Sequence, residues 1–182
     1  ITFLSRDNKL EYPYQTSWGC TTRMIAALIM VHSDDKGLVL PPKIAPQQVV
    51  IIPIGKDEKV FDLANEINDK LNKSNIVSYI DDSKKSPGFK FAEAEVNGIP
   101  LRIEIGPRDL EENNITFARR DIDEKVKVSL SANIVEEVEK MLEKIQNSLY
   151  EKALSRRESM TYNAKDFNEF KADLLKNVTE AI

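Results

Sequence analysis

The chain has 182 residues, of which 41% are apolar and 31% charged, an ordinary composition for a globular protein with one sizeable core. Its longest apolar run, Met24 to Val31, is far shorter than the ~20 residues of a membrane-spanning helix, so we expect no membrane partner. A net charge of −4 argues against a general polyanion binder, and a single cysteine excludes an internal disulfide and a cysteine-based zinc cluster. We expect a cytoplasmic protein and, since the chain starts without methionine in what reads as mid-domain sequence, a fragment.

The N-terminal quarter predicts a hairpin, a helix and a loop. Residues 2–4 and 10–15 flank the turn-prone tripeptide 7–9, which indicates a β-hairpin. Residues 22–32 predict a helix that is apolar on nearly every face, so we expect it to be buried against something large. Residues 34–47 are expected to form a loop, because they begin with a turn sequence and contain two adjacent prolines.

A second, self-contained pattern begins at residue 49. Residues 49–54 are a continuous apolar run, which is typical of a strand covered on both faces. Residues 76–80 predict a second strand, and Pro87 can begin a short helix that stops at Asn97 and Gly98. Between the two strands lies a predicted helix whose apolar stripe is Val60, Ala64, Ile67 and Leu71.

The remaining elements complete an α/β pattern. Residues 101–105 alternate apolar and charged side chains, as a half-buried strand does. Two more strands are predicted at 116–119 and 125–129, a long helix at 133–157, and the tail at 166–182 is amphipathic and helical. The order β-α-β-α-β-β-β-α predicts a mixed five-stranded sheet flanked by helices.

A polar segment just before the first helix carries candidate ligand-binding groups. Gly19 permits close approach of the backbone to a flat ligand, Trp18 offers a rigid wall, and Arg23 offers a planar cation suited to phosphate or to stacking on a purine. Alternatively, Trp18 belongs to a core and Arg23 is a helix-end charge that faces solvent. We expect Cys20 to be a small buried hydrophobe and His32 to be a helix-end group, so no metal site is expected.

Three segments, in order along the chain, resemble a known family. Residues 15–23 (QTSWGCTTR), 37–42 (GLVLPP) and 48–54 (QVVIIPI) resemble the third signature motif of class II prolyl-tRNA synthetases, archaeal/eukaryote-like branch, and the sequence that follows it. The resemblance implies that Arg23 is the catalytic arginine that contacts ATP. It also implies that the adenylate and proline pocket is lined by Gln15, Thr16, Trp18, Gly19 and Arg23.

The same resemblance implies how the chain is divided. Residues 1–45 would be the end of the class II catalytic domain, and residues 46–157 the anticodon-binding domain of a class IIa synthetase. Residues 158–182 would be a connecting helical segment towards an absent C-terminal domain.

Residues 88–110 and 119–121 resemble the family's anticodon-reading segment. The implied base contacts are stacking on Phe91, guanine-edge reading by Arg108 and Asp109, and a pocket completed by Glu95 and Arg102. The implied phosphate contacts are Arg119, Arg120 and Lys125. Guanine suits such a mixture, because arginine meets its O6 and N7 and a carboxylate accepts its N–H groups. The residues alone leave an alternative open, in which Arg102 and Glu104 pair on a solvated strand face and Phe91 is core.

The resemblance implies the C-terminal part of an enzyme that activates proline with ATP and transfers it to proline tRNA. We expect the intact enzyme to use ATP and Mg²⁺ and to be a homodimer. The family's motif-2 arginine and Mg²⁺-holding acids are absent here, so we expect this fragment alone to be inactive and to hold no cofactor. The alternative is a non-catalytic tRNA- or RNA-binding regulatory protein, which would have no need of an ATP-contacting arginine.

Overall fold

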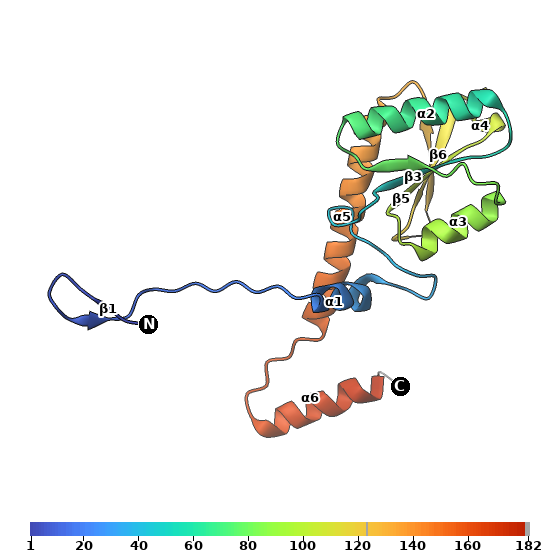
Figure 1. Ribbon diagram of the computed structural model, residues 1–182. Helices are drawn as coiled ribbons and strands as arrows, with labels where there is room; N and C mark the ends of the chain where they lie inside the picture. Colours follow the sequence, from blue (N-terminus) through green and yellow to red (C-terminus); the bar gives the residue numbers. More distant parts are fainter. Residues whose placement is uncertain (123, 181–182) are drawn as a thin grey trace.

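The computed structural model describes residues 1–122 and 124–180, and its centre is a five-stranded sheet (Figure 1). The strands are β3 (Val49–Pro53), β4 (Ser78–Ile80), β5 (Leu101–Ile105), β6 (Asn114–Arg119) and β7 (Lys125–Ser129). They lie in the order β4-β3-β5-β6-β7. The first three are parallel, and β5, β6 and β7 are antiparallel. The predicted mixed α/β sheet is therefore confirmed.

Helices cover the two faces of the sheet unequally. The helices α2 (Glu58–Lys73) and α5 (Ile134–Ser159) share one large apolar core with β3, β5, β6 and β7. The apolar stripe predicted for α2 is confirmed, since all four of its residues are at most 2% exposed. On the other face, α3 (Pro87–Val96) packs over a small apolar cluster whose strand residues come from β3 and β4. On that second face β5 and β7 instead present charged side chains, because alternate residues of a strand point to opposite faces.

The prediction that 101–105 is only half-buried is wrong. All five residues of β5 are buried, and Arg102 and Glu104 are only 8% and 7% exposed. The alternation of apolar and charged residues correctly indicated that the two faces of β5 differ, but β5 is the central strand of the sheet. Its charged residues are therefore covered by neighbours and pair with each other, a contact described below.

Three further helices complete the fold. The sequence did not predict the first of them, but it predicted the bounds of the other two closely. The helix α4 (Pro107–Glu111) follows β5 directly, with proline in its first turn. The long helix predicted at 133–157 is α5, and the tail contains α6 (Phe167–Glu180). Residues 181–182, the end of the predicted tail helix, lie outside the described residues. Among the described residues, no helix has both the length and the apolar character needed to cross a membrane.

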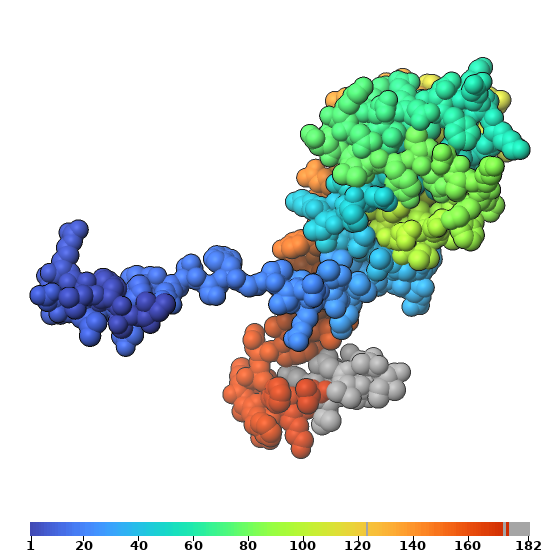
Figure 2. Space-filling view, viewed as in Figure 1, coloured from blue at the N-terminus to red at the C-terminus, as the bar shows by residue number. Residues whose placement is uncertain are grey.

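The N-terminal segment stands apart from the sheet (Figure 2). The predicted hairpin is confirmed by β1 (Phe3–Leu4) and β2 (Leu10–Glu11), which pair antiparallel. The predicted helix is α1 (Arg23–His32), but the expectation that it is buried is wrong for this chain. Within α1 no residue is buried, and Met24 and Met30 are 63% and 80% exposed. The reason is that α1 lies across α5 with its other apolar sides uncovered (Figure 1).

The predicted loop after α1 docks onto the C-terminal end of α3. The turn 34–37 is confirmed, and after it the N–H groups of Leu38 and Leu40 donate to the carbonyls of Val96 and Gly98 at 3.1 and 3.2 Å. Gly98 has a φ of +69°, and a Cβ there would lie 2.6 Å from the Cβ of Leu38. Glycine thus allows this close approach, which fixes the loop against the helix that carries Phe91 and Glu95.

Candidate nucleic-acid interface

One charged cluster lies where α3 meets the open part of the sheet. The strand β5 directs Arg102 and Glu104 to this face, α3 contributes Phe91 and Glu95, and β7 contributes Lys125. The register explains the meeting, since Arg102 and Lys125 both pair with Ala118 of β6 from opposite sides. The small alanine side chain between them leaves space for the two long cations.

Arg102 is held in one orientation by its neighbours. Its Nε donates to Glu104 Oε1 at 3.0 Å, and NH1 donates to Glu95 Oε1 at 3.1 Å. The guanidinium carbon lies 4.5 Å from the centroid of the Phe91 ring, which is cation–π distance. Two carboxylates and a ring therefore fix a guanidinium plane that is nearly buried, so this part of the site is formed without a ligand.

The outer rim of this cluster remains accessible. Lys125 donates to both carboxylate oxygens of Glu104 at 2.9 Å, yet its side chain is 53% exposed. Glu95 is 34% exposed and uses Oε1 for Arg102, which leaves Oε2 available as an acceptor. A base could therefore stack on the exposed part of Phe91, which is only partly buried, while its edge meets a carboxylate acceptor and an ammonium donor.

Arg108 and Asp109 lie in a second part of the interface, at the carboxyl end of β5. Asp109 Oδ2 accepts the N–H of Gly106 at 2.9 Å, which closes the first turn of α4, and Arg108 is exposed. A cavity of about 570 Å³ here is lined by Ile54, Gly106, Pro107, Arg108, Asp109, Glu112 and Lys127. The helices α2 and α3 leave β3 and β4 on opposite faces, so this crevice between β3 and β5 is the topological switch point where open α/β sheets bind ligands.

The two parts form one continuous strip. Lys125 and Lys127 lie two residues apart on the same face of β7, the first in the Arg102 cluster and the second at the Arg108 cavity. Lys127 Nζ contacts Glu112 Oε2 at 2.5 Å, and this bond raises the pKa of Lys127 and lowers that of Glu112. This charged strip, which runs from Phe91 and Glu95 of α3 to Arg108 and Asp109 of α4, alternates cations and carboxylates. It therefore suits the edge of a base, which carries both donors and acceptors, better than a bare polyanion.

Arg119 and Arg120, predicted to contact phosphates, are engaged within the chain. Arg119 donates to both oxygens of Asp121 at 3.0 and 2.7 Å, a bond that raises the pKa of Arg119. Arg120 donates to both oxygens of Asp34 at 2.8 and 2.6 Å and to the Glu95 carbonyl at 2.9 Å, and its side chain is 5% exposed. Their phosphate role stays a prediction, and the geometry gives both a structural contact instead. Of the three predicted phosphate groups, Lys125 is the accessible one.

The residues predicted for the adenylate pocket lie along an extended stretch before α1 and on its first turn. All five of them (Gln15, Thr16, Trp18, Gly19 and Arg23) are exposed, and Trp18 is 93% exposed. None of them lines the cavity at Arg108 and Asp109. Cys20, expected to be buried, is also exposed. His32 does end α1, as expected, where partial burial and then the charge of Lys152 lower its pKa.

Several functional neighbours were missed by sequence reasoning. Glu104 was read only as a solvated partner of Arg102, and Lys127, Glu112 and Asp34 were not singled out. The alternation in 125–129 could have placed Lys127 beside Lys125, but the Asp34–Arg120 pair joins residues 86 apart and has no local signal. Within the described part of the chain, no group of three or more His, Cys, Asp or Glu side chains could hold a metal ion.

Comparison with known proteins gives the family. The model of the family described as "Anticodon binding domain" matches residues 48–141, slightly more than half of the chain. The chain therefore belongs to the anticodon-binding domain family. Within it, the resemblance to prolyl-tRNA synthetases is confirmed by relatives named proline–tRNA ligase. That of Prosthecochloris aestuarii is 49% identical over 94% of this chain, and that of Ruminiclostridium cellulolyticum 52% identical over 93%.

A solved structure agrees with the sequence relatives. The prolyl-tRNA synthetase of Cryptosporidium parvum, complexed with L-proline and AMP, superposes with a TM-score of 0.87 at 39% identity. The match covers 95% of this chain and 38% of that one. The chain spans a little over a third of the length of these relatives.

Proposed function

We propose that this chain is the C-terminal part of a proline–tRNA ligase and that its charged strip reads the anticodon of proline tRNA. The observation that carries the proposal is the fixed Arg102 guanidinium, held over Phe91 by Glu95 and Glu104, beside the Arg108–Asp109 cavity. These groups lie on the open face of a domain from the anticodon-binding family. The relatives do not favour the alternative of a non-catalytic regulatory protein.

Proline anticodons share two adjacent guanines, and the strip offers two places suited to guanine. One is the Arg102 cluster, where Phe91 supports stacking and Glu95 Oε2 accepts N–H groups. The other is the cavity where Arg108 supplies a donor fork and Asp109 an acidic neighbour. Lys125 supplies an exposed cation for a nearby phosphate.

The catalytic part of the proposal concerns the intact protein. The parent activates proline with ATP and Mg²⁺, and Arg23 contacts the nucleotide while Gln15, Thr16, Trp18 and Gly19 line the pocket. The support is the motif itself and a structural relative whose complex contains L-proline and AMP. In this chain the five residues are exposed, so they would need the remainder of a catalytic domain to form a pocket. We further propose that the intact protein is a cytoplasmic homodimer and that this chain alone does not activate proline.

The test is binding of the chain to proline tRNA, followed by fluorescence anisotropy at fixed moderate salt. The comparison tRNA differs only in its two anticodon guanines. We expect the change to weaken binding more than tenfold, about 1.4 kcal/mol, and the Arg108→Ala, Asp109→Ala double variant to lose this discrimination. Equal binding of both tRNAs to the unaltered chain would contradict anticodon reading.

A further inference from the structure

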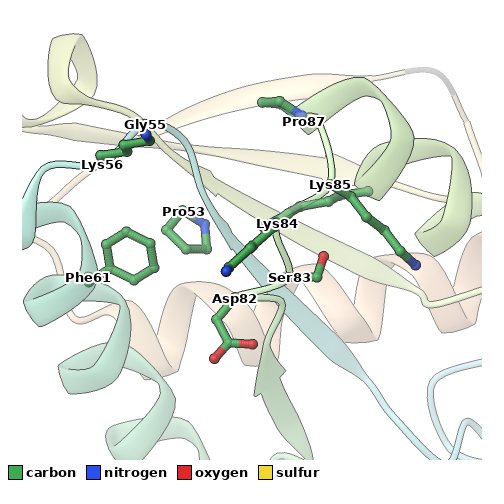
Figure 3. Close-up of a pocket in the computed structure, with 10 residues that line it drawn as sticks. Pro53, Gly55, Lys56, Phe61, Asp82, Ser83, Lys84, Lys85 and Pro87 are labelled. Atoms are coloured by element: carbon green, nitrogen blue, oxygen red, sulfur yellow. The ribbon is translucent and has the colours of Figure 1, made fainter.

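A second, more basic cavity lies on the same edge of the sheet (Figure 3). It has a volume of about 610 Å³ and lies at the carboxyl ends of β3 and β4, beside the first turn of α3. Its lining is Pro53, Gly55, Lys56, Phe61, Asp82, Ser83, Lys84, Lys85, Pro87 and Lys90. The walls thus contain four lysines and one carboxylate, in a chain whose net charge is −4. This is a local excess of positive charge that the whole-chain charge conceals.

Two of the four lysines already have partners within the chain. Lys85 forms an ion pair with Glu93 at 2.7 Å, and Figure 3 shows it pointing away from the cavity. Lys90 is buried and donates to the Asp81 carbonyl at 2.6 Å. Lys56 and Lys84 are exposed and have no ion-pair partner among residues 1–122 and 124–180, and Lys84 reaches across the opening toward Phe61 and Pro53. The cavity therefore offers two free ammonium groups to an anion.

The surroundings also suit a phosphate. The first turn of α3 borders the cavity and contributes the positive end of a helix dipole, although the Ser86 side chain already accepts the N–H of Phe89. Burial of Lys90 beneath the cavity adds a cation that water screens poorly, although Asp81, 3.7 Å away, partly offsets it. Pro53, Phe61 and Pro87 give the remaining wall an apolar character.

The cavity adjoins the Arg108–Asp109 part of the interface. Gly55 lines the basic cavity, and a Cβ on it would lie 3.7 Å from the Pro107 side chain, which lines the neighbouring cavity. The N–H of Ile54, next to Gly55, donates to the Ile105 carbonyl at 2.8 Å, which joins the two walls. An RNA strand with a base at Arg108 and Asp109 would have its neighbouring phosphates along this same edge.

We propose that the basic cavity binds backbone phosphate of the RNA strand whose bases the Arg108–Asp109 cavity reads, with Lys56 and Lys84 as the contacting groups. The proposal rests on the proposed function, because it takes the RNA strand from it. It differs in kind, since a phosphate contact carries no base information and contributes equally to every sequence. We therefore expect the two lysines to affect the salt dependence of RNA binding but not the preference for one anticodon over another.

The test measures affinity for proline tRNA and for the tRNA with altered anticodon guanines at several salt concentrations. In the Lys56→Ala, Lys84→Ala variant we expect weaker binding to both tRNAs by the same factor. The slope of log K against log salt should become shallower by about 0.7 for each lost phosphate contact. The ratio between the two tRNAs should stay as in the unaltered chain.

A matched control separates the cavity from net charge. Lys73 ends α2 at its far end and Lys144 lies on α5, both exposed, so Lys73→Ala, Lys144→Ala removes the same charge elsewhere. Equal slopes for the two double variants would overturn the cavity proposal while leaving anticodon reading intact. If the unaltered chain bound both tRNAs equally but the slope still depended on the two lysines, anticodon reading would be overturned, and a phosphate contact to RNA at the basic cavity would remain. If the unaltered chain bound neither tRNA, both would be overturned.

A final arm distinguishes RNA phosphate from free phosphate. The amide signal of Gly55 is followed by NMR during titration with inorganic phosphate and with AMP at constant ionic strength. Weak, unsaturated shifts for both, together with the changed RNA slope, support the RNA strand as the occupant. Saturation by AMP or phosphate at submillimolar concentration, with an unchanged RNA slope in the lysine variant, would overturn that assignment in favour of a free phosphate ligand.

Discussion

The sheet region and the N-terminal segment carry the two sets of residues that the sequence singled out, and they differ in how far each site is formed. Around the sheet, Arg102 is fixed by two carboxylates and a ring before any ligand arrives. In the N-terminal segment, Trp18 and Arg23 are exposed, as are the residues around them. One candidate site is preorganised within this chain, whereas the residues of the other are exposed among residues 1–122 and 124–180.

The difference follows from packing. A charged group can be held nearly buried only where its hydrogen bonds are satisfied and a rigid core supports its neighbours. The core between the sheet and the helices α2 and α5 supplies that support for β5. The helix α1 is apolar on several sides and packs against α5, but none of its residues is buried, and the residues before it are exposed.

The largest effect should come from the core beneath the interface. Phe117 of β6 is fully buried, and Phe117→Ala should lower the free energy of unfolding by about 3–5 kcal/mol through lost apolar contact and a cavity. Urea denaturation followed by circular dichroism measures this. A loss below about 1 kcal/mol would mean that the core does not support the strip as described.

A smaller effect should come from breaking the fixed guanidinium contact. Glu104→Leu removes the carboxylate shared by Arg102 and Lys125, and we expect it to destabilise the chain by about 2 kcal/mol, because Glu95 still holds one guanidinium N–H. Adding Arg102→Leu should cost less than the sum of the two single changes, since it removes the buried charge left unpaired. Strict additivity in the double variant would contradict this coupling.

The sequence predicts those features that depend on local periodicity, but not those that depend on contacts between residues far apart in the chain. The α2 stripe and the buried strand β3 follow from local periodicity, and the structure has both. The burial of Arg102 and Glu104 could not be predicted, since it depends on where β5 lies among the strands and, for Arg102, on the Phe91 ring lying against it. Exposure of α1 also escaped prediction, because an apolar pattern says that a surface needs a partner but not whether the chain supplies it.

The residues of the candidate site divide in the same way. Phe91, Glu95, Arg102, Arg108 and Asp109 were named from a resemblance, and the structure places the first three in one cluster and the last two at the neighbouring cavity. The internal pairing of Arg120 depends on the long-range docking of the loop after α1, which no local pattern encodes. Whether these residues bind RNA stays a prediction.

The Asp34–Arg120 pair, which joins the N-terminal part to the sheet, should give a modest pH effect. The Arg120 guanidinium lowers the pKa of Asp34 from 3.8 to about 2. Because the folded pKa is depressed, the stabilisation is complete above pH 3.8 and is lost as the pH falls towards 2. Asp34 is 47% exposed, so screening reduces its contribution to about 1 kcal/mol. The stability difference between the unaltered chain and Asp34→Asn should be constant from pH 7 to 5 and shrink below pH 4. A difference that grows on acidification would contradict the pairing.

The smallest effect should come from the exposed segment. Trp18→Ala and Arg23→Ala should each change the free energy of unfolding of this chain by less than about 0.5 kcal/mol, because neither side chain is buried here. The same changes in a protein that contains the relatives' full length should lower proline-dependent ATP–pyrophosphate exchange, if the proposed function holds. A large loss of stability in this chain would show that the N-terminal segment packs against the rest of the protein. A loss of exchange without a loss of stability would establish that these residues act on ligand, which is the sharpest form of the contrast with the sheet.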